Sequence, residues 1–341
     1  MIDPQEALRH WGITEAARPA ASPGLINGTW MVTGGVLQWV NPIFSHDVNR
    51  DIASITGHLA GRGMPTPVLL PGDGGRLWLP DPDGGCWRML TFIPGRTLSR
   101  ITDPATAAAA GRLVGRFHAA LSDCAHAFIA PSRDIHNTPL RVAALEAALT
   151  DHPDHALRPE VEPLAEAILS GWADWLVRWG APGALPRRVC HGDLKISNIR
   201  FAAESLDGLC MVDLDTLCRQ SFSVELGDAW RSWCNPAGED DPTAATFELA
   251  HFEASACAWM AEAPALSGAE RESLAAGVER ICLELAARFC ADALSNSYFR
   301  EDRMRWPEVG RHNLLRTQGQ LNLAAAAARN RAACEAILRR G

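Results

Sequence analysis

The sequence reads VCHGDLKISNI over residues 189–199 and MVDLD over residues 211–215. Three polar residues, Asp193, Asn198 and Asp213, stand at fixed offsets between short apolar runs. Phosphoryl transfer needs a carboxylate that orients and deprotonates a hydroxyl, together with carboxylate and amide oxygens that hold magnesium. Asp and Asn also stabilise ordinary turns. A loop between two strands could nevertheless aim all three side chains into one cleft, and we interpret the stretch as that kind of site.

Lysine is almost absent from the chain. Lys195 is the only lysine, against 31 arginines. A solitary Lys beside Asp193 suggests a place where a compact, rotatable ammonium is needed instead of a planar guanidinium.

Composition excludes several classes of protein. The 341 residues carry a net charge of −8, with 47% hydrophobic and 21% charged residues. We therefore expect a globular protein with a real core, and no nucleic-acid partner, since the basic residues are spread along the chain. No signal-like segment or long apolar run is visible, which predicts a cytoplasmic protein without membrane contact. The ten cysteines contain no C-x-x-C pair and are interpreted as reduced core residues. The oligomeric state, monomer or homodimer, stays open.

The pattern of apolar and turn-forming residues changes near Pro94-Gly95 and divides the chain into two parts. Residues 1–93 predict a small β-rich unit, with a helix over 47–61. Residues 94–341 predict a larger, mainly helical unit with one β interruption between 187 and 217. We expect an α+β fold in which 1–93 binds nucleotide and 94–341 carries catalysis and acceptor binding. The strands are expected within 25–40 and at 68–70, 76–79, 87–93, 199–201 and 209–214, and the later helices over 103–122, 139–149, 158–179, 224–234, 243–262, 268–293 and 308–338.

The H-G-D-x-x-x-x-N motif, followed by a strand ending in D-x-D, resembles the aminoglycoside phosphotransferase and choline kinase group. That resemblance implies a bilobal protein-kinase-like fold and the cofactors ATP and Mg. It makes Asp193 the catalytic base and lets Lys195 contact the transferring phosphate. Asn198 and Asp213 become metal ligands, while Asp215 is either a third ligand or points away from the cleft.

Five further segments are similar to one branch of that group, the N-acetylhexosamine 1-kinases. Their order along the chain is the same, and together they imply a sugar acceptor. The segments are GLINGTW at 24–30, LQWVNPIF at 37–44, IHNTPLR at 135–141, LGDAWR at 226–231 and RTQ at 316–318.

The resemblance also implies a nucleotide site. A glycine-flanked turn lets backbone amides approach phosphate oxygens, although such a turn can also be a plain hairpin. The segment before Pro94 corresponds to the hinge that meets adenine. The implied nucleotide-binding residues are Gly24, Asn27, Gly28 and Thr29 in the turn, and Thr91, Phe92 and Ile93 at the hinge.

For the acceptor, Asp228 and Arg231 are three residues apart and share a helix face, where they either bind hydroxyl groups or form a surface ion pair. His136 and Asn137 precede a predicted helix, and N-capping alone would explain Asn137. Tyr298 and Arg316 complete the predicted acceptor site.

Two features depart from the family pattern. Gln38 and Trp39 stand where such kinases carry a third-strand cation, and the next helix offers Asp51 in place of Glu. Gly192 stands where the acetylhexosamine branch commonly has Asn. The cations that could substitute are Arg50, Arg88 and Lys195.

The sequence thus predicts an ATP- and magnesium-dependent kinase of a small-molecule hydroxyl, with the anomeric hydroxyl of a hexose or N-acetylhexosamine favoured. An aminoglycoside, choline or homoserine kinase is the alternative within the fold. A pseudokinase that only binds nucleotide also stays open: the missing third-strand cation supports it, and the complete set of Asp193, Asn198 and Asp213 opposes it.

Overall fold

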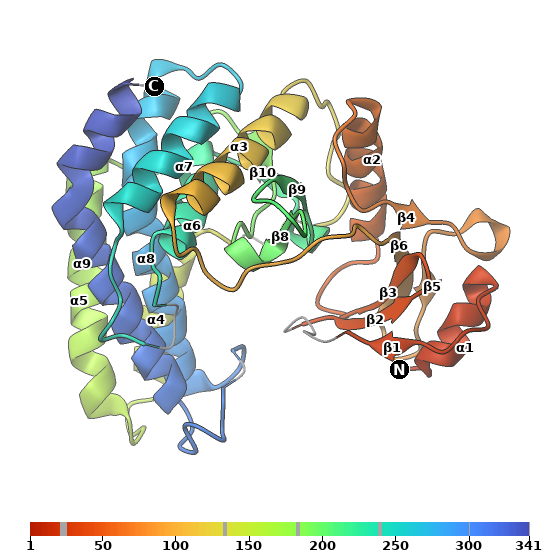
Figure 1. The fold of residues 1–341 in the computed structure, drawn as a ribbon. Coiled ribbons are helices and arrows are strands. Elements are labelled where there is room, and N and C mark those ends of the chain that lie inside the picture. The colour runs from red at the N-terminus through yellow and green to blue at the C-terminus, as the bar shows by residue number, and fades with distance from the viewer. Residues whose placement is uncertain (21–25, 132–134, 182–184, 238–240, 300, 341) are drawn as a thin grey trace.

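The computed structural model describes residues 1–20, 26–131, 135–181, 185–237, 241–299 and 301–340. A small antiparallel sheet forms the N-terminal part, and helices make up most of the C-terminal part (Figure 1). The predicted α+β class, with a β-rich beginning and a mainly helical remainder, is confirmed.

The sheet has the order β1-β2-β3-β6-β4, and β5 pairs with the free end of β6. A hairpin joins β2 to β3, and Gly34 supplies the positive φ of 77° that its turn requires. In β3, Leu37 and Val40 face the interior, while Gln38 is half-buried. The strands are β1 (Arg18–Pro19), β2 (Gly28–Val32), β3 (Gly35–Val40), β4 (Leu69–Leu70), β5 (Leu79–Pro80) and β6 (Cys86–Thr91).

Two helices accompany this sheet, α1 (Pro4–Leu8) and α2 (Val48–Gly61). The apolar residues of α2 recur at helical spacing and are buried: Val48, Ile52, Ile55 and Leu59. On the same helix Asp51 accepts hydrogen bonds from the Ile129 and Ala130 amides and from the His126 ring, so it anchors the loop after α3.

The C-terminal helices follow the predicted ranges with one clear exception. α7 begins at Leu249, not at 243, because the Asp241 carboxylate accepts the Thr243 and Ala244 amides and holds this segment in a turn. The helices are α3 (Pro104–Ala120), α4 (Thr138–Asp151), α5 (Arg158–Trp179), α6 (Phe222–Trp233), α7 (Leu249–Glu262), α8 (Gly268–Ser295) and α9 (Arg311–Arg340).

Two two-stranded ladders interrupt the helices. β8 (Ile199–Phe201) pairs with β9 (Gly208–Met211), as expected, although β9 ends before Asp213. β7 (Arg188–Cys190) and β10 (Cys218–Gln220) form a second ladder that the sequence analysis missed, since three residues are too few to show alternation. The catalytic stretch therefore connects two ladders.

Glycines let α6 approach α8 closely. A Cβ atom at Gly277 would lie 1.9 Å from the Ser223 carbonyl oxygen, and one at Gly227 would lie 2.6 Å from the Gly277 backbone. This contact fixes α6 directly beneath the catalytic loop.

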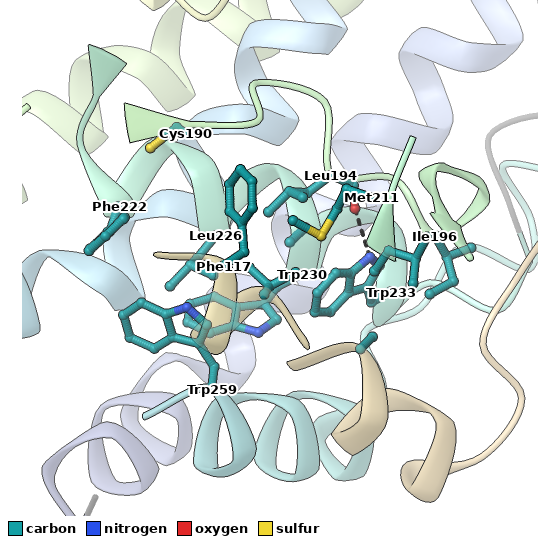
Figure 2. Close-up of a cluster of buried hydrophobic side chains, with 14 of the residues drawn as sticks. Phe117, Cys190, Leu194, Ile196, Met211, Phe222, Leu226, Trp230, Trp233 and Trp259 are labelled. Carbon is teal, nitrogen blue, oxygen red and sulfur yellow. Dashed lines mark hydrogen bonds between the residues drawn. The ribbon is translucent and has the colours of Figure 1, made fainter. Parts of the chain in front are cut away.

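The core below that loop is built from large aromatic side chains (Figure 2). Trp230, Trp233 and Trp259 are fully buried with Phe117 and Phe222 around them. The Trp233 indole donates a 2.8 Å hydrogen bond to the Leu194 carbonyl, so the core is joined to the catalytic loop. All ten cysteines are free thiols, as predicted.

Among the described residues, none of the helices combines the length and the apolar character that a membrane crossing requires.

Candidate active site

The catalytic loop leaves β7 at Cys190 and reaches β8 through a 3₁₀ turn over Ile196–Asn198. Leu194 and Ile196 are buried in the core, whereas Asp193 and Lys195, on either side of Leu194, are only half-buried. Lys195 Nζ lies 2.8 Å from Asp193 Oδ2, and Asn198 Nδ2 donates to the same oxygen at 3.0 Å. The structure thus brings these three predicted residues into direct contact.

Asp193 is ionised at neutral pH. Desolvation acts to raise its pKa, but the charge and hydrogen bond of Lys195 outweigh it and lower the pKa below the usual range. His136 contributes in the same direction through its charge. Asp193 therefore offers a carboxylate that can accept a hydrogen bond from a hydroxyl.

Asp213 has an unusual backbone conformation. Its backbone adopts the left-handed conformation, φ 63° and ψ 57°, which is uncommon for a residue other than glycine. Its carboxylate has no hydrogen-bond partner among the described residues. Desolvation by the surrounding protein and the charges of Asp215 and Asp193 raise its pKa to about 6. An unpaired carboxylate next to other carboxylates is the environment in which a cation binds.

Gly192, in the catalytic loop, packs closely against Thr216, in the segment that carries Asp213. It has a φ of 82°, and a Cβ atom there would lie 2.3 Å from the Thr216 carbonyl oxygen. The His191 ring nitrogen Nε2 lies 2.9 Å from the Val212 carbonyl, and the Thr216 hydroxyl donates to the His191 carbonyl at 2.8 Å. Only glycine fits this crossing.

Glu225 on α6 is a functional residue that the sequence analysis missed. Its carboxylate accepts the amides of His191 at 2.7 Å and Gly192 at 3.0 Å, and Gln220 Nε2 at 2.8 Å. No local sequence pattern marks this residue, because its main contacts are with backbone amides. Glu225 fixes the two residues immediately before Asp193.

His118, Cys190 and Glu225 lie close enough together to suggest a metal site. However, the Glu225 oxygens already accept backbone amides, and His118 Nδ1 accepts the Trp259 indole at 3.0 Å. Burial raises the pKa of the Cys190 thiol well above its usual value, so it stays protonated. This cluster is a hydrogen-bonded support for the loop.

Asp228 and Arg231 support the loop from the same helix. Asp228 accepts the Leu194 amide at 3.1 Å, and the Arg231 guanidinium donates to its other oxygen at 3.0 and 3.2 Å. Both residues are buried, so the alternative of a surface ion pair is wrong. Their contact with an acceptor stays a prediction.

Arg88 on β6 occupies the centre of a buried polar network. It lies opposite Gln38 in the β3–β6 register and donates to the Gln38 side-chain oxygen at 2.8 and 3.0 Å. It also donates to Asp215 at 2.5 and 2.9 Å and to Asn49 at 3.3 Å. Asn27 donates to Asp215 Oδ2 at 2.6 Å. All five guanidinium N–H groups are therefore engaged.

This network bears on two questions that the sequence left open. Arg88 lies opposite Gln38 on the neighbouring strand and is a buried cation, but Asp215 neutralises its charge. Arg50 instead pairs with Asp47 at the exposed end of α2. Both oxygens of Asp215 accept hydrogen bonds, which favours the alternative that Asp215 points away from the metal position.

The predicted phosphate turn is described only in part, because Gly24 lies outside the described residues. Asn27 is buried and directed at Asp215. Gly28 and Thr29 belong to β2, and a Cβ atom at Gly28 would lie 2.6 Å from the Trp30 ring. Their contact with nucleotide stays a prediction.

The hinge residues begin with Thr91, the last residue of β6. The Thr91 amide donates to the Val68 carbonyl at 2.9 Å, and Phe92 is exposed beneath the Arg200 guanidinium. Arg200 on β8 donates to the Ile93 carbonyl at 2.8 Å, so it connects the hinge to the catalytic region. Contact of these residues with adenine also stays a prediction.

The remaining predicted acceptor residues precede α4, follow α8 or belong to α9, and His136, Tyr298 and Arg316 contact residues of α8. His136 Nδ1 lies 2.8 Å from Glu284 Oε1, and the Asn137 side chain N-caps α4, so the capping alternative is confirmed for Asn137. Tyr298 is half exposed against the Arg288 guanidinium. Arg316 lies over the Phe289 ring.

A cavity of about 1240 Å³ opens beside the catalytic loop. It extends from Gly192 and Thr216 past His136 to Trp175 and Arg280, on α5 and α8. This volume is sufficient for a small-molecule acceptor.

Comparison with known proteins agrees with this geometry. A homoserine kinase from Zymomonas mobilis subsp. mobilis is 23% identical over 228 residues, covering 65% of this chain and 64% of that protein. A homoserine kinase from Acidiphilium cryptum is 30% identical over 183 residues, covering 52% of this chain and 51% of its own. The chain thus spans between half and two thirds of the length of these relatives.

Solved structures share the fold at low identity. The amicoumacin kinase hAmiN, in complex with AMP-PNP, Ca2+ and Ami, aligns with a TM-score of 0.63 at 13% identity, over 92% of this chain and 93% of its own. A microcompartment-associated aminopropanol kinase aligns with a TM-score of 0.63 at 15% identity, over 97% of both chains. Residues 20–260 match the sequence pattern of the phosphotransferase enzyme family (APH). The chain belongs to the phosphotransferase enzyme family.

Proposed function

We propose that this protein transfers the γ-phosphoryl group of magnesium-bound ATP to a hydroxyl of a small molecule. The observation that carries this proposal is the contact of Asp193 with Lys195 and Asn198, beside the unpaired carboxylate of Asp213. In this proposal residues 1–93 bind the nucleotide and residues 94–341 hold the catalytic groups and the acceptor.

Asp193 would orient the acceptor hydroxyl and take its proton as the oxygen attacks the γ-phosphorus. One O–P bond forms, and the bond from the γ-phosphorus to the oxygen of the departing ADP breaks. Lys195 offsets charge on the phosphoryl oxygens. Its own pKa is raised, since the charge of Asp193 outweighs the effect of burial, so it stays protonated.

Asn198 and Asp213 fit a magnesium ion. Because Asn198 Nδ2 donates to Asp193, its carbonyl oxygen Oδ1 is available to a cation. Magnesium prefers oxygen ligands and commonly binds through one or two protein groups together with substrate phosphates. When bound, the ion would neutralise charge on the phosphates.

The acceptor has two candidate classes. The five sequence segments favour a hexose or N-acetylhexosamine, phosphorylated at the anomeric hydroxyl. The curated relatives are homoserine kinases, which favours a small hydroxy amino acid. A silent nucleotide-binding module is disfavoured because such a module needs no carboxylate base, whereas Asp193 is present in contact with Lys195 and Asn198.

The test is ADP release by the purified protein with MgATP across N-acetylglucosamine, N-acetylgalactosamine, galactose, glucosamine, homoserine, choline and kanamycin. Turnover that requires both magnesium and one acceptor would support the proposal. Magnesium-dependent ATP binding by calorimetry, without ADP from any acceptor, would contradict it and favour a pseudokinase.

A further inference from the structure

The cavity beside the catalytic loop is lined by arginines whose hydrogen-bond partners are uncharged. Three arginines line it, Arg187, Arg219 and Arg280, and within the described part of the chain none of them pairs with a carboxylate. Arg187 donates to the Arg219 carbonyl, and Arg219 donates to the Cys124 and His126 carbonyls. A backbone carbonyl satisfies a hydrogen bond but does not neutralise a cation.

Three carboxylates line the same cavity. Asp51 accepts hydrogen bonds from two backbone amides and contacts the His126 ring, and Asp215 pairs with Arg88. Glu272 is exposed. In the described part of the chain none of these carboxylates contacts the three arginines, so the guanidinium charges are available to an anionic ligand.

Arg280 is the best-placed of the three arginines. It extends from α8, its Nε donates to the Thr138 hydroxyl at 2.8 Å, and its guanidinium lies 5.9 Å from the Trp175 ring centre. Its terminal nitrogens have no hydrogen-bond partner among the described residues. Burial lowers the pKa of this guanidinium, and only the charge of Glu284 opposes that effect. A planar guanidinium with both terminal nitrogens available matches a carboxylate in a bidentate arrangement.

A short chain of contacts leads from Arg280 to His136. Thr138, which accepts from Arg280, donates to Glu284 at 2.7 Å, and Glu284 contacts His136 at 2.8 Å. His136 and Gly192 both line the cavity, and Gly192 directly precedes Asp193 in the chain. The cavity therefore extends from Arg280 to the catalytic loop.

We propose that this cavity binds the acceptor through a carboxylate held by Arg280, so that the acceptor is a carboxylate-bearing alcohol and not a neutral sugar. The inference rests on the proposed kinase function. In this arrangement the acceptor carboxylate binds to Arg280 of α8, and the acceptor hydroxyl reaches Asp193.

Pairs of acceptors that differ by one carboxylate test this inference. Homoserine is compared with 3-amino-1-propanol, which is the same molecule without its carboxylate, and glucuronic acid with glucose. We expect the acidic member of at least one pair to have the higher kcat/KM. A preference for the neutral member in every pair that reacts would overturn the proposal.

Two variants connect that preference to Arg280. Loss of a charged hydrogen-bonding group lowers affinity by about tenfold to a hundredfold. Arg280→Met should raise KM for the acid by that factor while leaving KM for ATP unchanged, and Arg280→Lys should recover part of the loss. Arg178→Met is the matched control, since Arg178 pairs with Glu279 and does not line the cavity. Equal effects of Arg280→Met and Arg178→Met would overturn the assignment.

Direct binding separates this proposal from the kinase function. Calorimetry measures the binding of homoserine or glucuronic acid without turnover. Binding that Arg280→Met abolishes would support the anion site even if no acceptor were phosphorylated. Absence of binding by every acid tested, in a protein that still binds MgATP, would overturn it.

Discussion

The Arg88 guanidinium and the Asp215 carboxylate form a buried bidentate ion pair, with Nη1–Oδ1 at 2.5 Å and Nη2–Oδ2 at 2.9 Å. Arg88 belongs to the sheet of the N-terminal part, and Asp215 follows Asp213 by two residues in the C-terminal part. Asn27, just before β2, donates to the same carboxylate. This ion pair, with the Asn27 hydrogen bond, thus holds three parts of the protein together. They are the segment that carries Asp213 and Asp215, the sheet of the N-terminal part, and the start of β2.

Removal of Arg88 should strongly destabilise the protein. Arg88→Met leaves Asp215 without its buried partner, which costs about 3–5 kcal/mol of unfolding free energy. The double variant Arg88→Met/Asp215→Leu should recover much of that loss, because no buried charge remains. Urea denaturation measures both.

The matched control is Arg62→Met, which breaks the exposed pair with Asp123. Exposed pairs contribute less than about 1 kcal/mol. If Arg88→Met were as mild as Arg62→Met, the importance assigned to the buried pair would be wrong.

The crossing at Gly192 predicts intolerance to any side chain. Gly192→Ala combines a left-handed backbone, which costs about 1–2 kcal/mol, with a Cβ atom 2.3 Å from the Thr216 carbonyl. Gly63→Ala is the matched control, since Gly63 has a φ of 71° and open space around it. We expect thermal unfolding to show a much larger loss for Gly192→Ala. Equal losses would mean that the contact with Thr216 relaxes freely.

The buried pair of His136 and Glu284 predicts a pH-dependent contribution to stability. Burial opposes the charged imidazole, but the charge and hydrogen bond of Glu284 outweigh it and raise the pKa of His136; Asp228 adds to this increase and Arg288 opposes it. Because the pKa of His136 is higher in the folded than in the unfolded protein, its pair with Glu284 stabilises the fold fully at pH values below the unfolded-state pKa of about 6.5. It is lost as the pH rises through the folded-state pKa.

Glu284→Gln tests that relationship. The difference in unfolding free energy between wild type and variant should be larger at pH 6 than at pH 9, and Glu284 stays ionised over this range because its own pKa is lowered. Breaking a buried pair costs about 3 kcal/mol or more at the lower pH. A difference that does not change with pH would show that His136 remains neutral.

The local part of the site was predictable from sequence, and the long-range part was not. Asp193 and Asn198 lie five residues apart in one loop whose apolar residues, Leu194 and Ile196, are fixed in the core. Arg88 could be named only as one of three candidate cations. Its partner lies 127 residues away, and that pairing depends on how the sheet packs on the C-terminal part.

Helices with a clear apolar period were predicted well, and short strands were not. The predicted bounds 158–179 coincide with α5, because buried residues recur along this helix at regular spacing. β7 and β10 contain three residues each and are stabilised by pairing with each other, which no local pattern reveals. Glu225 was missed for a related reason. The groups that donate to its carboxylate are backbone amides, and their positions cannot be recognised from the sequence.

Replacement of Asp193 tests the central claim most directly. Asp193→Asn keeps the shape of the side chain but removes the carboxylate that would accept the hydroxyl proton, a contribution of about 10²- to 10⁴-fold to the rate. The measurement is ADP release with MgATP and the acceptor that wild type uses best, beside circular dichroism of both proteins. We predict a loss of turnover of at least about a hundredfold with the fold retained. Near-normal turnover by the folded variant would contradict the account.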